Sequence, residues 1–222
     1  MAWMKCARCE HVFTEGYFTK DALGVIFADV QEVQQVGHDF VGRRLVSARM
    51  IEKILPYASD GAWLDVGFGN GSLLFTAEEF GFTPVGIDLR MSNVEAMNAA
   101  GIEAYCRDIT ELHQSDVFRV ISMADVLEHM PFPAEGLKAA RRLLCDGGVI
   151  LLSMPNMDCL EWKVMDAQEL GSCYYWSELE HYHNFTRRRL WSLLREHGFE
   201  PLRYGVSERY GISMEVVARK TG

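Results

Sequence analysis

Acidic side chains recur in this sequence where short apolar segments end. Asp65, Asp88, Asp108 and Asp125 stand at or just past such segments, and Glu128 follows closely. For any one of them the simplest interpretation is a cap on the next helix. Four acids along one rim favour a binding site, and their charge suits a ligand with hydroxyl groups and positive charge rather than a polyanion.

A glycine loop follows the first of these acids. Gly67, Gly69 and Gly71 permit a tight turn and let a ligand approach the backbone at the start of the next helix. A dinucleotide fingerprint would place its third glycine where Ser72 stands, so that match fails. Asp65 would also repel a pyrophosphate over the loop, whereas it would attract an ammonium or a sulfonium.

The elements that position these acids are predicted to alternate regularly. Strands are expected at residues 62–66, 83–87, 103–106, 117–123 and 149–153, and helical segments near 40–55, 72–80, 94–100 and 134–144. This alternation predicts a parallel sheet with helices on both faces, which binds ligands at the carboxyl ends of its strands. At that edge Asp88 could accept hydrogen bonds from ribose hydroxyls, so the loop and Asp88 together predict a site for a nucleoside without phosphates.

Two cysteines near the N-terminus have the spacing of half a zinc site. Cys6 and Cys9 form a CxxC pair, but a closed structural site needs four ligands. His11 and His38 are the nearest further candidates, and neither stands at a convincing spacing. A metal site and an inert pair of thiols both remain open, and we favour the inert pair.

Composition and charge limit the classes of partner. The chain is 49% hydrophobic and 24% charged, and its formal net charge of −9 disfavours a nucleic-acid partner. The basic cluster Arg187 to Arg189 is interpreted as a solvated or structural face at a helix start. No apolar run is long enough to span a membrane, and the first residues lack the apolar core of a secretory signal. We therefore expect a cytoplasmic protein with reduced cysteines and no membrane partner.

Six motifs in a fixed order carry a family resemblance. They are LDVGFGNG (64–71), VGID (85–88), RDI (107–109), ISMADVLEHMPFP (121–133), LLCDGGVILLSMPN (143–156) and HYHNFTRRRLWSLLREHGFEP (181–201). With these motifs, roughly residues 41–220 resemble the class I S-adenosylmethionine-dependent methyltransferases of the small-molecule type, in particular the ubiquinone-biosynthesis O-methyltransferases and the type 11 and 23 methyltransferase group. The resemblance implies an α/β fold with a doubly wound, mostly parallel seven-stranded sheet and an antiparallel C-terminal hairpin near residues 203–206 and 214–218. Phe68 departs from the Cys or Ser that many members carry.

The resemblance also implies which residues bind the cofactor, S-adenosyl-L-methionine, and its product, S-adenosyl-L-homocysteine. Asp65 would hold the ammonium group and Asp88 the ribose. Leu89 would pack on adenine, Asp108 would accept from the adenine amino group, and Ile109 would supply backbone contacts. The rest of the implied set comprises Gly67, Phe68, Gly69 and Gly71 in the loop, and Met123 and Ala124 at the methionine end.

His129 is the candidate general base, and Glu128 is its neighbour. A base is needed only where the acceptor must lose a proton during methyl transfer. The alternative is that His129 merely hydrogen-bonds the loop beside Pro131. Asp125, Glu128 and His129 form DxxEH, which is similar to the ExxEH arrangement associated with a divalent metal in ubiquinone O-methyltransferases. Asp125 shortens the first ligand arm, so we expect activity without a metal.

The acceptor is expected to be a small molecule. His181, His183, Tyr175 and Trp176 belong to an aromatic and acidic stretch and could wall a pocket for a planar or apolar acceptor. Such residues before a helix are also typical of a core, and the paired histidines are equally consistent with a structural role. We expect an N-terminal segment at 1–37 and one methyltransferase domain at 38–222, with a lid at 157–185. The accepting atom (O, C or N) and the oligomeric state are left open.

Two other functions compete with methyl transfer. Ser72 and the acidic rim disfavour a nicotinamide-dependent oxidoreductase. A cofactor-binding module without catalysis, which docks a protein partner through the N-terminal cysteines or the aromatic stretch, would keep the same glycines and Asp88. These residues predict cofactor binding and do not by themselves predict turnover.

Overall fold

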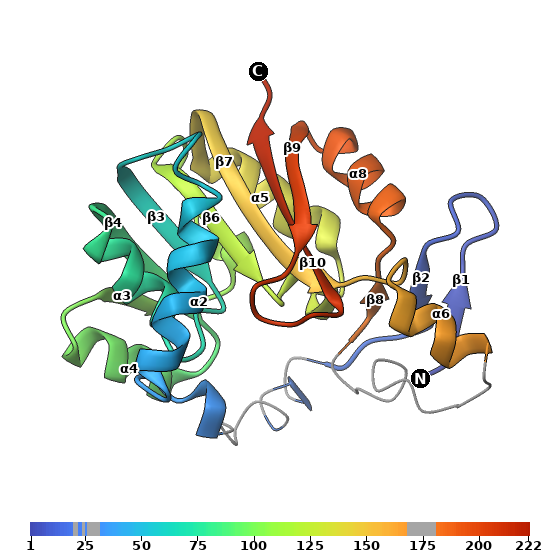
Figure 1. Cartoon of the computed structure of the whole chain (residues 1–222), viewed down its shortest axis with the longest axis horizontal. Helices are drawn as coiled ribbons and strands as arrows, with labels where there is room; N and C mark the ends of the chain where they lie inside the picture. Colours follow the sequence, from blue (N-terminus) through green and yellow to red (C-terminus); the bar gives the residue numbers. More distant parts are fainter. Residues whose placement is uncertain (20–21, 24, 26–31, 168–180) are drawn as a thin grey trace.

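A seven-stranded sheet with the order β5-β4-β3-β6-β7-β10-β9 forms the centre of the molecule (Figure 1). The computed structural model describes residues 1–19, 22–23, 25, 32–167 and 181–222. The strands are β3 (Gly61–Val66), β4 (Phe82–Asp88), β5 (Glu103–Cys106), β6 (Phe118–Ala124), β7 (Leu144–Pro155), β9 (Phe199–Val206) and β10 (Ser213–Lys220). Pairing is parallel from β5 to β7, and β10 runs antiparallel to both β7 and β9. The predicted fold class is confirmed.

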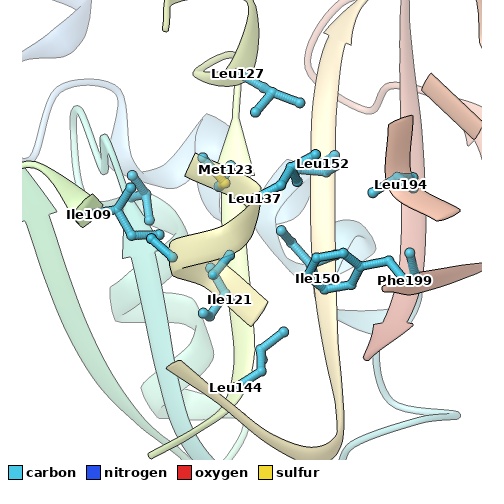
Figure 2. Close-up of a cluster of buried hydrophobic side chains, with 14 of the residues drawn as sticks. Ile109, Ile121, Met123, Leu127, Leu137, Leu144, Ile150, Leu152, Leu194 and Phe199 are labelled. Atoms are coloured by element: carbon cyan, nitrogen blue, oxygen red, sulfur yellow. The ribbon is translucent and has the colours of Figure 1, made fainter. Parts of the chain in front are cut away.

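Helices cover both faces of this sheet. The helices that cover it are α2 (Phe40–Glu52), α3 (Ser72–Glu79), α4 (Met91–Ala99), α5 (Pro133–Leu143) and α8 (Arg187–Glu196). Helix α6 (Leu160–Ala167) lies apart from this sheet (Figure 1), and three short 3-10 helices are η1 (Glu32–Gln34), η2 (Ile109–Glu111) and η3 (Leu127–His129). Leu137 of α5 and Leu194 of α8 share one buried cluster with Leu152 of the sheet (Figure 2). Ile51 of α2 and Leu151 belong to a second cluster. Neighbouring side chains of β7 therefore enter different cores, because side chains alternate along a strand, and this explains its continuous apolar run.

The turn after α5 differs from its prediction. The sequence predicts a helical segment near 134–144 and a strand that begins at Val149, with residues 145–148 between them. The helix ends at Leu143, β7 begins at the next residue, and Gly147 has a φ of 69° within the strand. The register against β6 shifts between Phe118 and Val120, so the glycine turn forms an irregularity in the pairing.

A second, three-stranded antiparallel sheet joins the N-terminus to a distant segment (Figure 1). It consists of β1 (Trp3–Lys5), β2 (Val12–Thr14) and β8 (His183–Asn184). The N-terminal hairpin thus pairs with residues of the predicted lid. Residues 168–180 of that lid lie outside the described residues, and both the lid and the domain boundary at residue 38 stay predictions. Across the described ranges, no helix combines the length and apolar character needed to cross a bilayer.

Candidate active site

A cavity of about 380 Å³ lies at the carboxyl ends of β3, β4 and β6. Parallel pairing aligns these ends, since Asp65 in β3 is in register with Gly86 in β4 and Ser122 in β6. The lining includes these residues expected from the sequence: Asp65, Gly67, Phe68, Gly69, Asp88, Leu89, Asp108, Ile109, Ala124, Asp125, Glu128, His129 and His181. The sheet therefore brings together side chains that are far apart in the sequence.

Some expected site residues lie elsewhere. Met123 packs in the core beside α5, because its side chain points to the opposite face of β6 from that of Ala124 (Figure 2). Gly71 caps α3 and does not line the cavity. His183 belongs to β8 and does not line it either. Tyr175 and Trp176 lie outside the described residues.

The glycine loop leaves its backbone open to the cavity. Gly67 and Gly69 have φ angles of 67° and 53°, in the left-handed region that favours glycine. A Cβ on Gly69 would have no neighbour within 4 Å, so the backbone conformation and not packing requires glycine there. The amide of Gly69 donates to Asp88 Oδ2 at 3.2 Å and ties the loop to β4.

Asp65 is a buried carboxylate at the edge of the cavity, with only 3% of its surface exposed. Its Oδ1 accepts a hydrogen bond of 2.6 Å from Ser122 Oγ, which in turn accepts one of 2.8 Å from Trp63 Nε1. Burial raises the pKa of Asp65 to about 7, and the hydrogen bond from Ser122 and the nearby Arg209 guanidinium partly oppose that rise. A ligand cation at this carboxylate would stabilise its charged form.

Asp88 and Asp108 cap local turns and also face the cavity. Asp88 Oδ1 accepts from the amide of Arg90 at 2.9 Å. Asp108 Oδ1 accepts from the amide and the hydroxyl of Thr110 at 2.8 and 2.6 Å, so it caps η2. Leu89, which directly follows Asp88 and lines the same cavity, is 55% exposed. The arrangement offers hydrogen-bond acceptors for a sugar and a base, with an apolar side chain beside them.

Glu128, His129 and His181 form a cluster in the lining of the cavity. Glu128 and His181 are buried, and the rings of His129 and His181 meet edge to face with centroids 4.5 Å apart. The amide of Tyr182 donates to the carbonyl of Glu128 at 2.9 Å, which anchors the His181 segment on η3. Each of the three side chains offers a ligand atom within 4.8 Å of the others, so they could hold a divalent ion.

Asp125 does not join this cluster, although the sequence had grouped it with Glu128 and His129. Its Oδ2 instead lies 3.3 Å from Arg209 Nη1, and its Oδ1 accepts from Ser153 Oγ at 3.3 Å. His181 takes the place expected for Asp125, since β8 folds back onto η3. The spacing of residues in the sequence could not predict that His181, and not Asp125, joins Glu128 and His129.

His183 joins the two sheets instead of lining the cavity. Its Nδ1 lies 3.0 Å from His11 Nε2, and its Nε2 lies 3.3 Å from the carbonyl of Pro131. Burial lowers the pKa of His183, and it lowers that of His11 to about 3. Both rings are therefore neutral at physiological pH.

Cys6 and Cys9 lie in the turn between β1 and β2. Amides of Cys9 and Arg8 lower the pKa of the Cys6 thiol. In the part of the chain that the structure describes, neither cysteine belongs to a cluster of three metal ligands. Zinc binding by this pair stays untested.

Several cavity residues had no signal in the sequence. Arg43 and Ser47 enter from α2, and Arg209 and Tyr210 enter from the β9–β10 loop. Their roles depend on chain segments that pack over the site, which no local spacing records.

Comparison with known proteins identifies the family. The model of a methyltransferase domain matches residues 42–204. A ubiquinone biosynthesis O-methyltransferase of Pectobacterium atrosepticum is 27% identical over 109 residues, which are 46% of this chain and 45% of that protein. One from Psychrobacter cryohalolentis is 32% identical over 103 residues, or 42% and 40% of the two chains. The match thus spans less than half of these curated relatives.

Solved structures share the fold at low identity. The 1,6-didemethyltoxoflavin-N1-methyltransferase of Burkholderia thailandensis, solved with 1,6-didemethyltoxoflavin and S-adenosylhomocysteine, is 17% identical, covers 98% of each chain and has a TM-score of 0.69. The magnesium protoporphyrin IX methyltransferase of Synechocystis, with bound S-adenosylhomocysteine, is 18% identical, covers 90% of this chain and 94% of its own, and has a TM-score of 0.63. Because the family model spans more than half of its length, the chain belongs to the methyltransferase domain family.

Proposed function

We propose that the chain is an enzyme that transfers a methyl group from S-adenosylmethionine to an oxygen, carbon or nitrogen atom of a small molecule and releases S-adenosylhomocysteine. The observation that carries this proposal is Asp65, a buried carboxylate beside an open glycine loop in a cavity that also holds Asp88 and Asp108. Such a site attracts a cationic nucleoside and repels a pyrophosphate.

The residues of the cavity fit this cofactor, which supplies an electrophilic methyl group on a sulfonium when bound. In our assignment Asp65 holds the ammonium, and the backbone at Gly67 and Gly69 receives the methionine part. Asp88 accepts from the ribose hydroxyls. Asp108 accepts from the adenine amino group, and the exposed side chain of Leu89 packs on the adenine ring.

We assign His129 as the general base. An acceptor hydroxyl or amine would give its proton to an unprotonated ring nitrogen of His129, which lines the cavity. Glu128, buried beside it, offers a carboxylate oxygen within 4.8 Å of a His129 ring nitrogen. A metal at Glu128, His129 and His181 would occupy the same ring, so the base and metal-ligand roles exclude one another at that nitrogen.

We propose a planar small molecule as acceptor, with no nucleic-acid or membrane partner and a cytoplasmic location. Matched relatives are named for O-methylation in ubiquinone biosynthesis, and a structural neighbour for N1-methylation of a didemethyltoxoflavin, which leaves the accepting atom open. His181 would contact the acceptor, and Tyr175 and Trp176 remain predicted acceptor contacts, whereas His183 is engaged with His11 and Pro131. Five cysteines in the described ranges are free, as expected in a reducing compartment.

Isothermal titration and a transfer assay test this function. The protein should bind S-adenosylhomocysteine and not NADH, because the site disfavours a pyrophosphate. With methyl-labelled S-adenosylmethionine and a panel of phenols, catechols and ring amines, label should pass to an acceptor. Binding of NADH but not S-adenosylhomocysteine would favour an oxidoreductase, and tight cofactor binding without transfer to any acceptor would favour a non-catalytic module.

A further inference from the structure

Arg209 places a cation at the end of the cavity that holds Asp65. It lies in the loop between β9 and β10, at residues 207–212, and lines the cavity. Its Nη1 lies 3.3 Å from Asp125 Oδ2 and donates to the carbonyl of Ala124 at 3.3 Å. Its side chain is 32% exposed. The guanidinium is therefore held between the ends of the sheet strands and the open cavity.

A buried polar network fixes the loop that carries Arg209. Glu215 of β10 is 2% exposed, and its Oε1 accepts from the amide of Glu208 at 2.7 Å and from Ser207 Oγ at 3.1 Å. Lys53 Nζ, which follows α2, lies 2.6 Å from Glu215 Oε2 and 2.8 Å from Glu208 Oε1. These charge-assisted contacts define the position from which Arg209 extends.

The amino-acid end of the cofactor requires a cation close to Asp65. Its ammonium and carboxylate are attached to the same carbon, so an ammonium at Asp65 brings a carboxylate near that acid. Without a cation between them, these like charges would repel in a site of low dielectric constant. Arg209 is electrostatically coupled to Asp65, since its charge lowers the pKa of that carboxyl.

The other arginines of the cavity wall are placed differently. Arg90 pairs with Asp88 at 3.7 Å, at the expected ribose position. Arg107 directly precedes Asp108, at the expected adenine position. Arg43 pairs with Asp39 at 3.9 Å on α2.

We propose that Arg209 binds the carboxylate of the cofactor's methionine part, and that Glu215 and Lys53 position it. The inference rests on the proposed function, since it takes S-adenosylmethionine as the cofactor. It makes the β9–β10 loop part of the cofactor site, together with the glycine loop, which lines the same cavity.

Two ligands that differ in the amino-acid end test the proposal by isothermal titration. S-adenosylhomocysteine carries the carboxylate, whereas 5′-methylthioadenosine lacks the whole amino-acid group. Arg209→Ala should weaken S-adenosylhomocysteine binding by about 10- to 100-fold, the range for losing a charged hydrogen bond. Its affinity for 5′-methylthioadenosine should stay unchanged, which also shows that the variant is folded. Arg209→Lys should restore part of the lost affinity, because it restores the charge without the planar fork.

Arg43→Ala is the matched comparison, and Glu215→Gln tests the positioning network. Arg43→Ala should change the affinities for both ligands by similar factors, and Glu215→Gln should reproduce a smaller form of the Arg209→Ala loss. An unchanged S-adenosylhomocysteine dissociation constant in Arg209→Ala, equal losses for both ligands, or a selective loss in Arg43→Ala would overturn the assignment. Failure of the wild-type protein to bind S-adenosylhomocysteine would instead refute the proposed function.

Discussion

Acids at the strand ends serve local structure and the cavity at once. Asp108 caps η2 and Asp88 holds the amides of Gly69 and Arg90, while both line the cavity. From the sequence alone, capping and ligand binding are alternative interpretations of these residues. They are compatible, because a carboxylate has more acceptor sites than its backbone partners use. Mutations at these acids will therefore act on the loop as well as on the ligand.

Replacing Asp88 tests the assignment of the ribose site. Asp88→Ala should weaken S-adenosylhomocysteine binding by about 1 to 3 kcal/mol, because ribose hydroxyls lose a charged acceptor. Isothermal titration measures the change. Asp88→Asn is the control, since it keeps one carbonyl oxygen for the Gly69 amide and should lose less affinity. An unchanged dissociation constant in Asp88→Ala would show that the ribose binds elsewhere.

Asp65 should make cofactor binding depend on pH. Its pKa of about 7 in the empty site means that below pH 7 it must lose a proton before it pairs with an ammonium. S-adenosylhomocysteine affinity should therefore fall as pH decreases below about 7, by at most roughly tenfold per pH unit, and level off above it. Titrations from pH 5.5 to 8.5 measure this. Asp65→Asn should bind more weakly and lose this pH dependence; an identical slope in the variant would place the titrating group elsewhere.

His129 should affect turnover and not cofactor affinity. His129→Ala should lower kcat by about 100-fold or more, since general bases contribute on that scale, while leaving the S-adenosylhomocysteine dissociation constant unchanged.

Chelator should not reduce wild-type turnover. Zinc ions should inhibit it by occupying Glu128, His129 and His181. Full activity in His129→Ala would remove it as the base, and loss of activity on chelation, restored by a divalent ion, would favour the metal role.

At the scale of elements, the N-terminal hairpin is linked to the site through β8. The carbonyl of Pro131 can only accept, so His183 Nε2 donates to it and His183 Nδ1 accepts from His11 Nε2. This chain of hydrogen bonds requires the His183 ring to be neutral, because its Nδ1 accepts, while burial is what keeps the His11 ring neutral. Pro131 follows η3, which carries His129, and β8 follows His181. The hairpin therefore supports the segments that hold both cavity histidines.

Acid should weaken this link. His11 has a pKa of about 3 in the folded protein against 6.5 ordinarily, so between these values the unfolded chain binds more protons and stability falls as pH decreases. We expect His11 to contribute a loss of about 1 kcal/mol in unfolding free energy from pH 7 to pH 5, after discounting for its partial exposure. Urea unfolding of the wild type and of His11→Phe, which keeps an aromatic ring, measures it.

The difference between these two proteins is the informative quantity. Asp65 acts in the opposite direction, because its raised pKa makes stability fall as pH rises from about 4 to 7. That contribution is common to both proteins and cancels. An identical pH dependence in the wild type and His11→Phe would show that His11 does not carry the effect.

At the scale of the whole molecule, the sheet was predictable from the sequence, whereas the chain segments that pack over the cavity were not. Apolar strands that alternate with helices and end in acids determine a parallel sheet locally, and β3 to β6 lie within two residues of their predicted bounds. The antiparallel β10 came from the family resemblance. The family resemblance placed Met123 at the methionine end of the cofactor site. Because side chains alternate along β6, that of Met123 points into the core instead (Figure 2).

The sequence by itself determined the fold class and the row of carboxylates beside a glycine loop. Hydrophobic periodicity, turn residues and the alternation of strands with helices can all be read over short distances along the chain. Only the tertiary structure decided which charges meet. It paired Asp125 with Arg209, brought His181 to Glu128 and His129, and moved His183 to the N-terminal hairpin. Each of these contacts joins segments far apart in the sequence, and their geometry depends on how loops fold over the end of the sheet.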